Sequence, residues 1–201
     1  MHAYITDSKE RQEVPLLLAA VAITVSWAVS SFLSSYRLTV PTWIDITSVP
    51  LLYGILHTLF DQYCWDWSPI RSAGFVKVPM LGGLWSGEVW SSHDNFKIGH
   101  PVEMRIEQRW TKMRITFTGT SSSSHSILAA IFLDAPEGVV LDYEYQNEPL
   151  PGALEAMQIH HGTARLRATS GDTMEGLYYT GRGRGNHGSI RLSRQAPTHR
   201  N

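Results

Sequence analysis

Cysteine is almost absent from this chain, because Cys64 is the single one in 201 residues. A lone cysteine excludes an internal disulfide framework and suits a reducing compartment. The formal net charge is also small, −1 at pH 7, which argues against a bulk binder of polyelectrolytes. We therefore expect neither a disulfide-stabilised secreted domain nor a protein that binds DNA or RNA.

The usual signatures of catalytic and cofactor sites are missing as well. The sequence has no GxxxxGK[ST] phosphate loop, no GxGxxG after a strand and no zinc-ligand spacing. His160 and His161 are adjacent, but neighbouring strand residues point to opposite faces and do not ligate one metal without a bulge. A hydrolase using His125 or His161 lacks a specified base and orienting acid. We expect no catalytic residue, no metal site, no cofactor and no enzyme activity.

Charged side chains are missing from a long segment near the N-terminus. Val14–Tyr36 contains no Asp, Glu, Lys, Arg or His. As a helix it would be roughly 35 Å long, enough to cross a hydrocarbon core of about 30 Å. A signal peptide is the competing interpretation, but the apolar run is too long and no small-x-small cleavage site follows it. We predict a transmembrane helix over about residues 14–37.

A second uncharged segment lies between Asp45 and Asp61. It is shorter than the usual span of about 20 residues and contains Pro50, Gly54 and His57, so a buried helix of a soluble protein is the alternative. Aromatic residues surround it in the manner of interfacial belts: Trp43, Tyr63, Trp65 and Trp67. We predict a second transmembrane helix over about residues 43–63, and thus a hairpin with both ends on one side. The basic flanks favour the cytoplasmic side for both ends: Lys9, Arg11, Arg71 and Lys77.

The remainder of the chain is made of short alternating segments. Apolar and polar residues alternate in runs separated by Gly, Pro, Asn, Asp or Ser, and no pattern long enough for a crossover helix intervenes. Short loops favour pairing between sequence neighbours. We predict an all-β, eight-stranded, up-and-down barrel, lipocalin- or calycin-like, after the hairpin, with domains 1–67 and 68–201. The predicted strands are 84–90, 102–109, 112–119, 124–133, 139–147, 159–168, 173–180 and 188–194.

Alternation also assigns each strand residue to a face. Where the charged set faces solvent, the opposite set lines the interior, and several inward residues are polar. Buried hydroxyls and amides are costly unless they are satisfied, so their convergence favours a ligand cavity over a dry core. Near the end of the chain, the run Gly181–Gly185 alternates Gly with Arg, which suits a phosphate at a barrel mouth. A solvated hairpin loop is the alternative there.

Aromatic residues near these polar positions offer faces on which bases could stack. We therefore predict one ligand site with both kinds of residue. The candidate ligand-binding residues are Gln108, Trp110, Ser124, Ser126, Tyr143, Tyr145, Asn147, Tyr178, Thr180 and Arg182.

With these residues in view, essentially the whole chain resembles the membrane effectors of bacterial cyclic-oligonucleotide anti-phage signalling (CBASS) that have two transmembrane helices and a β-strand-rich domain. The apolar pair carries part of the resemblance, and the order and spacing of short motifs carry the rest. These are GLWSG at 83–87, QRW at 108–110, TGTSSSSHS at 118–126, LDYEYQNEP at 141–149, HGTARL at 161–166 and GLYYTGR at 176–182.

The resemblance implies a protein of the bacterial inner membrane whose barrel faces the cytoplasm. It implies that the barrel binds a cyclic dinucleotide made by a partner nucleotidyltransferase (CD-NTase). Binding would drive homo-oligomerisation of the hairpins, disrupt the lipid bilayer and kill the infected cell, an abortive infection.

A membrane-anchored, lipocalin-like carrier of a small hydrophobic ligand is the alternative. Gly83-Leu84-Trp85 also resembles the GxW start of lipocalins. A lipid carrier should have an almost wholly apolar lumen and is usually exported. The inward tyrosines, Gln108 and Asn147, together with the lone cysteine, argue against it.

Overall fold

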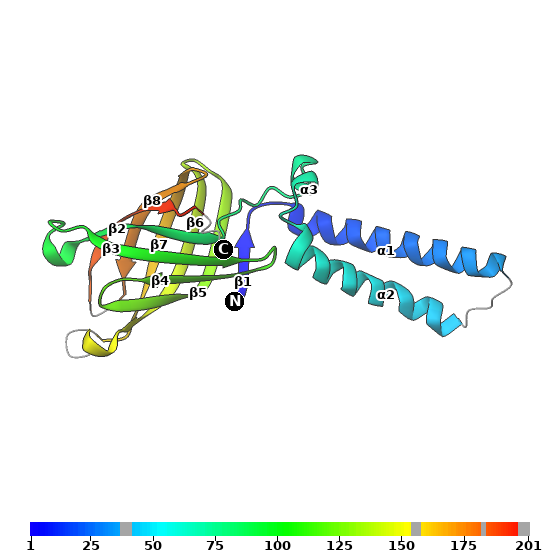
Figure 1. The fold of residues 1–201 in the computed structure, drawn as a ribbon, viewed down its shortest axis with the longest axis horizontal. Coiled ribbons are helices and arrows are strands. Elements are labelled where there is room, and N and C mark those ends of the chain that lie inside the picture. The colour runs from blue at the N-terminus through cyan, green and yellow to red at the C-terminus, as the bar shows by residue number, and fades with distance from the viewer. Residues whose placement is uncertain (37–41, 154–157, 182–183, 197–201) are drawn as a thin grey trace. The chain divides into compact units, whose positions relative to one another are not determined.

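The computed structural model describes residues 1–36, 42–153, 158–181 and 184–196. The chain divides into two units, one made of Met1–Asp7 with Val78–Asn201 and the other of Ser8–Lys77. Figure 1 shows the first as a barrel of strands and the second as a helical hairpin. The expected domains were 1–67 and 68–201; in this grouping residues 1–7 go with the barrel and residues 68–77 go with the helices.

The helical unit is built on two long helices. Helices α1 (Glu10–Ser35) and α2 (Thr42–Leu59) pack side by side and run in opposite directions (Figure 1). A π-helical turn, η1 (Phe60–Cys64), continues α2, and a short helix, α3 (Ser68–Ser72), follows. Glu10 ties the two ends of the unit together, because its carboxylate accepts a hydrogen bond of 2.5 Å from the Lys77 N–H.

Among the described residues, α1 is the one helix that is long and apolar enough to cross a membrane. Its large apolar side chains are mostly exposed in the single chain, including Leu16, Trp27 and Phe32. Such a surface suits lipid or neighbouring helices better than water. The second predicted span, 43–63, is confirmed as helical but not as membrane-crossing. Helix α2 has 18 residues against 26 in α1, and it contains Pro50 and His57.

The strands pair in sequence order and form a closed barrel, in which β9 returns to β2. All neighbours in this order are antiparallel. The predicted all-β class is confirmed, and each predicted strand overlaps an observed one. The strands are β2 (Gly83–Ser91), β3 (His100–Gln108), β4 (Lys112–Thr118), β5 (Ser122–Ala135), β6 (Gly138–Pro149), β7 (His160–Ser170), β8 (Thr173–Thr180) and β9 (His187–Arg194). Two 3₁₀ turns, η2 (Ser92–Asp94) and η3 (Pro151–Ala153), lie in the connections.

A ninth strand, β1 (His2–Thr6), was not predicted. It fills a split in the wall between β4 and β5, antiparallel to the first and parallel to the second. Ser126 Oγ bridges this split, because it accepts the Ile115 N–H at 2.9 Å and lies 2.7 Å from His2 Nε2. The Asp7 carboxylate accepts the N–H groups of Leu133 and Asp134. The prediction missed β1 because five residues beside a membrane segment give too short a pattern for alternation to register.

One end of the barrel is filled and closed around Trp85. This side chain is fully buried, and its Nε1–H donates to the Leu81 carbonyl at 3.0 Å. The Arg194 guanidinium lies 4.3 Å from the centre of the Trp85 ring and donates to the Gly82 carbonyl at 2.5 Å. The Gln108 side chain accepts the N–H groups of Leu81 and Gly82. The segment before β2 is thus fastened across this end.

The strand wall is tightly packed where β7 and β8 meet. A Cβ added to Gly176 would lie 1.9 Å from the Arg165 carbonyl oxygen, which belongs to the backbone and has no freedom to rotate away. Gly176→Ala should therefore lower the free energy of unfolding by about 1–3 kcal/mol. Denaturant unfolding of the full chain in detergent, followed by tryptophan fluorescence, measures the change.

Gly171→Ala is the matched control, because nothing lies within 4 Å of a Cβ at Gly171. It should change stability by less than about 0.5 kcal/mol. Equal effects of the two substitutions would contradict the packing described for β7 and β8.

Candidate ligand-binding site

A cavity of about 470 Å³ opens at the end of the barrel opposite Trp85. The loops at this end connect β2 to β3, β4 to β5, β6 to β7 and β8 to β9. The lining comes from strands all around the barrel, so the cavity is the open half of the interior. Its walls are Val89, Ser91, His93, His100, Val102, Phe117, Gly119, Thr120, Ser121, Ser122, Ser124, Tyr143, Tyr145, Asn147, His160, Tyr178, Thr180, Arg184, Asn186 and Ile190.

The inward side chains of β6 show why the cavity lies at this end. Leu141, Tyr143, Tyr145 and Asn147 all point inward, and they become more polar along the strand. Strand pairing sets Asn147 beside Ser124 of β5 and beside His160 of β7. The apolar half therefore packs dry around Trp85, and the polar half remains open. Alternation places each of these residues on the inner face, and strand register brings the polar residues to the same position along the barrel axis.

Two tyrosine rings lie against glycine backbone on the neighbouring strand. Tyr145 pairs with Gly162, where an added Cβ would lie 2.4 Å from the ring. Tyr178 pairs with Gly188, where an added Cβ would lie 2.4 Å from its ring. Because glycine has no side chain, each tyrosine ring can lie directly against the backbone of the neighbouring strand. Tyr143 lies beside Tyr145, with ring centres 6.1 Å apart.

The structure brings together a majority of the predicted ligand-binding residues. They come from strands β5, β6 and β8, and all of them line the cavity. They are Ser124, Tyr143, Tyr145, Asn147, Tyr178 and Thr180. Thr180 also holds its own loop, because its Oγ1 accepts the Asn186 N–H at 2.8 Å.

Three predicted residues do not line the cavity. Gln108 and Trp110 lie at the closed end, where Gln108 donates to the Pro79 carbonyl at 3.0 Å and Trp110 is buried in the turn between β3 and β4. Ser126 faces inward, but its hydroxyl is used in the wall beside β1. Alternation gave the inner face for Gln108 and Ser126 but not the position along the barrel axis. Arg182 lies outside the described residues.

Several cavity residues were not predicted. Arg184 belongs to the same Gly–Arg run as Arg182, so the sequence did contain a signal for an arginine at this place. His93 lies in the connection between β2 and β3, and His100 is the first residue of β3, so both lie outside the strands predicted from alternation. His100 Nε2 lies 2.8 Å from Asp94 Oδ2, and this hydrogen bond lowers the pKa of the Asp94 carboxyl.

Burial keeps the phenols of Tyr143 and Tyr145 neutral. Burial raises the pKa of Tyr143, with the neighbouring Tyr145 adding to the shift, and burial likewise raises the pKa of Tyr145. Nearby Arg184 acts against the shift at Tyr145. Within the described residues, the hydroxyls of Tyr143, Tyr145 and Tyr178 make no hydrogen bond, so they remain available to a ligand. The cavity thus offers neutral O–H donors, aromatic faces and one guanidinium near its mouth.

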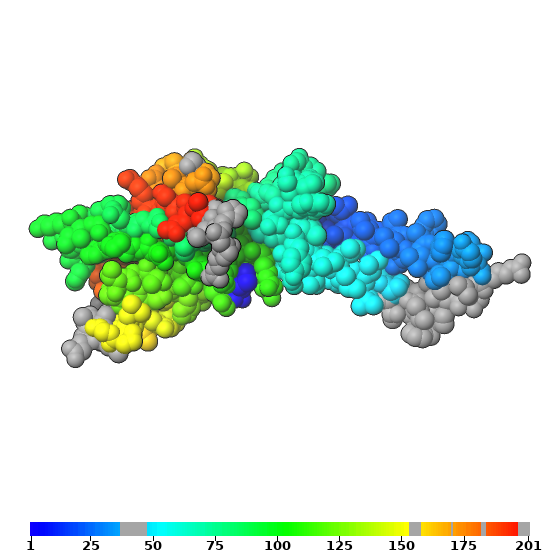
Figure 2. All heavy atoms as spheres, viewed as in Figure 1, coloured from blue at the N-terminus to red at the C-terminus, as the bar shows by residue number. Residues whose placement is uncertain are grey.

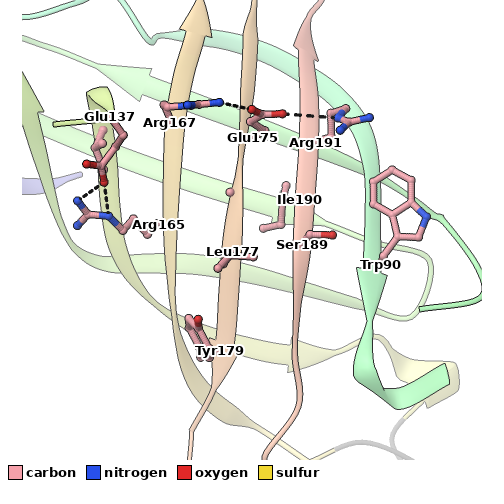
Figure 3. A pocket seen from close by; sticks show the side chains of 12 residues that line it. Trp90, Glu137, Arg165, Arg167, Glu175, Leu177, Tyr179, Ser189, Ile190 and Arg191 are labelled. Carbon is pink, nitrogen blue, oxygen red and sulfur yellow. Dashed lines mark hydrogen bonds and ion pairs between the residues drawn. The ribbon is translucent and has the colours of Figure 1, made fainter. Parts of the chain in front are cut away.

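Metal chemistry has no support in the described part of the chain, where no group of three or more His, Cys, Asp or Glu side chains could hold an ion. A second hollow, of about 650 Å³, lies on the outer face of β7, β8 and β9 (Figure 3). Its arginines are engaged by carboxylates: Arg165 with Glu137, and both Arg167 and Arg191 with Glu175. The interior cavity, with unengaged donors, is therefore the candidate site.

The raised tyrosine pKa values predict a loss of stability at alkaline pH. A group whose pKa is higher in the folded state stabilises folding fully below its unfolded pKa, here about 10, and loses that contribution as pH rises toward the folded value. The free energy of unfolding should therefore fall above about pH 10. The double variant Tyr143→Phe/Tyr145→Phe should lose less over that range. Urea unfolding at a series of pH values measures it.

Tyr179→Phe serves as the control, because Tyr179 is exposed on the outer face of the same barrel. It should leave the alkaline loss unchanged. An alkaline loss that is identical in the parent and the double variant would show that the two buried phenols do not titrate as described.

Two family models match this chain. Residues 76–194 match the model described as Cap15, cyclic dinucleotide receptor domain, and residues 12–66 match the model described as Cap15, TM helices. The chain is also 30% identical over 187 residues to CD-NTase-associated protein 15 from Yersinia aleksiciae, which covers 90% of this chain and 87% of that protein. The resemblance expected from the short motifs is confirmed, and the chain belongs to the Cap15 family.

Proposed function

We propose that this protein is an anti-phage CBASS effector whose barrel binds a cyclic dinucleotide in the cavity at its open end. The observation that carries the proposal is the chemistry of that cavity, which lies within the segment matching the cyclic dinucleotide receptor model. The ligand would come from a partner CD-NTase. The chain needs no cofactor and acts as a receptor and not as an enzyme.

The cavity suits a ligand with two bases and two phosphates. Its volume of about 470 Å³ falls within the range of roughly 300–1,000 Å³ typical of small-molecule sites. Tyr143, Tyr145 and Tyr178 supply flat faces for bases, and their hydroxyls supply hydrogen bonds. Arg184, Ser124 and Asn147 supply polar contacts nearer the mouth, where a guanidinium pairs well with a phosphate.

The hydrophobic-ligand carrier is less well supported. Its lumen should be apolar along its length, whereas here the apolar half of the barrel is filled by its own side chains. Met104, Met113 and Met174 are all fully buried there, together with Trp85. The space that remains open has apolar walls such as Phe117 and Ile190, but hydroxyls, amides, imidazoles and Arg184 line it as well, so it is not wholly apolar.

The membrane half of the proposal rests on the helical unit. We place both helices in the inner membrane, with the barrel and both termini in the cytoplasm, as the basic flanking residues favour. A two-helix hairpin is too small to enclose a pathway, so membrane damage requires many copies. Ligand would favour assembly only by binding the assembled state more tightly than the resting one. Disruption of the bilayer would then kill the infected cell.

Ligand binding is tested with the full chain in detergent, because a fragment starting at residue 68 would lack β1. A ligand at about 100 times its dissociation constant should add roughly 2.7 kcal/mol of stability, which thermal shift detects. Cyclic di-AMP, cyclic di-GMP, cyclic GMP–AMP and a fatty acid form the panel. Arg184→Ala and Asn147→Ala should weaken binding of the active cyclic dinucleotide by about 1–3 kcal/mol each.

Gln108→Ala is the matched control for these two variants. Its amide holds the closed end and does not line the cavity, so it should lower the melting temperature without changing affinity in calorimetry. Stabilisation by the fatty acid alone would instead identify a carrier. Unchanged affinity in both Arg184→Ala and Asn147→Ala would move the site away from the mouth.

The membrane step is tested in cells that express the full chain with or without CD-NTases. Leakage of a membrane-impermeant dye should require a synthase, because the resting protein favours the unassembled state. Arg184→Ala should reduce leakage at equal expression. Leakage of the same extent without any synthase would identify a constitutive membrane toxin.

A further inference from the structure

An apolar strip crosses the outer face of the barrel at β1 and β5. A bulge in β5 shifts the register between Ser126 and Leu128, so that Ile127 and Leu128 both point outward. Their exposed fractions are 40% and 53%, and that of Ile5 on β1 is 71%. Contiguous exposed apolar side chains on a folded domain mark an interaction site. We call Ile5, Ile127 and Leu128 the β1/β5 strip.

Charges of opposite sign flank the strip. Lys112 of β4 pairs in register with Ala3, and Glu144 of β6 pairs in register with Leu128. The parallel pairing of Tyr4 with Ala129 sets Ala3 beside Leu128. One row across the wall therefore reads Lys112, Ala3, Leu128, Glu144. Figure 1 shows β1, β4 and β5 together on this side, and Figure 2 shows the start of the chain, in blue, reaching the surface.

The flanking charges are not engaged within the chain. Across the described ranges, Lys112 and Glu144 form no ion pair, whereas neighbouring charges do. Arg114 pairs with Glu107, and Arg165 pairs with Asp142. The strip thus presents a basic edge and an acidic edge that are both available to a partner.

We propose that the β1/β5 strip is a two-fold interface between two copies of this chain. In a two-fold contact the same patch meets itself. If the two-fold axis runs parallel to β5, Lys112 of each copy faces Glu144 of the other copy, so the contact contains two such charge pairs. An axis across the strands would set like charges against each other. The arrangement of charge therefore selects a second copy as the occupant and fixes its orientation.

Each exposed ion pair stabilises such a contact little by itself, and its main effect is on orientation. The apolar strip supplies the contact area, and anchoring in a membrane raises the effective concentration of copies. Strand β1 leads into α1 after residues 7–9, so pairing of strips pairs chain segments that continue directly into the membrane helix. The inference names the surface used in the assembly proposed above, and it rests on the proposed function only for its dependence on ligand.

The outer hollow on β7, β8 and β9 is the competing surface (Figure 3). Leu177 and Tyr179 are exposed there, but its charges already pair within the chain. It offers no unpaired edge that would select a second copy.

Cysteine crosslinking distinguishes these surfaces, since residues near a two-fold axis meet their own copies. Leu128→Cys and Leu177→Cys are each made in a Cys64→Ser background of the full chain. Membranes at high expression are treated with a short bismaleimide, alone and with cyclic di-AMP, cyclic di-GMP or cyclic GMP–AMP. Leu128→Cys should give a covalent dimer, and Leu177→Cys should not. A dimer from Leu177→Cys only, or from neither variant, would overturn the proposal.

Charge reversal tests the orientation of the contact. Lys112→Glu and Glu144→Lys should each remove most of the Leu128→Cys dimer, and the double reversal should restore it. Glu103→Lys, on the exposed face of β3, is the control and should leave the yield unchanged. If the double variant crosslinks no better than either single variant, Lys112 does not face Glu144 of the other copy, and the proposed orientation is wrong.

The two hypotheses fail in different ways. A restored dimer that no cyclic dinucleotide increases, in a chain that none of them stabilises, supports the interface and counts against the proposed ligand. Stabilisation by a cyclic dinucleotide and synthase-dependent leakage, with no effect of either charge reversal, would support the proposed function and overturn the interface.

Discussion

The closure of one barrel end by Trp85 is the constraint on which the rest of the structure depends. Its ring is buried between the Leu81 carbonyl and the Arg194 guanidinium, and Gln108 fastens the same segment. Because this end is filled, the described cavity opens at the other end and is bordered by the polar half of the interior. Both chain connections to the helical unit also leave from this end, next to Asp7 and Val78. The proposed recognition site is therefore at the barrel end opposite the one where the chain enters and leaves the barrel.

Strand β5 runs from the mouth of the cavity toward the closed end of the barrel, so its residues contribute to both ends. Ser124 lines the cavity, whereas Ser126, two residues on, holds β1 through His2. The bulge then exposes Ile127 and Leu128 on the outside. A small change in the position of β5 at the mouth would thus reach the strand that precedes α1. A bulge bends its strand and changes the direction of its side chains. In β5 it lets one strand contribute Ser124 to the cavity and Ile127 and Leu128 to the outer surface.

The sequence predicted inner and outer faces well and positions along the barrel poorly. Gln108 and Asn147 both follow the alternation and both point inward, yet they lie at opposite ends. Axial position depends on strand register and tilt, which no single strand encodes. The bulge at Ile127 reverses the parity of the rest of β5, and five residues of β1 are too few to show alternation. The tyrosines of β6 follow the predicted alternation because the extra residue of the bulge belongs to β5, and β6 pairs with β7 without a register shift.

The glycines opposite Tyr145 and Tyr178 limit how the cavity responds to a ligand. Each ring fits where a neighbouring side chain is missing, so its position is set by backbone and not by mobile side chains. A preorganised wall spares the ordering cost of binding, and we expect such a wall to change little when a ligand binds. A ligand shifts an equilibrium only by its differential affinity for the two states. Under the proposed function, the difference would arise at the mouth, where Arg184, Asn186 and the turn of residues 119–121 line the cavity from loops. Contacts to these loops, more than stacking on the tyrosines, are what would couple ligand binding to assembly.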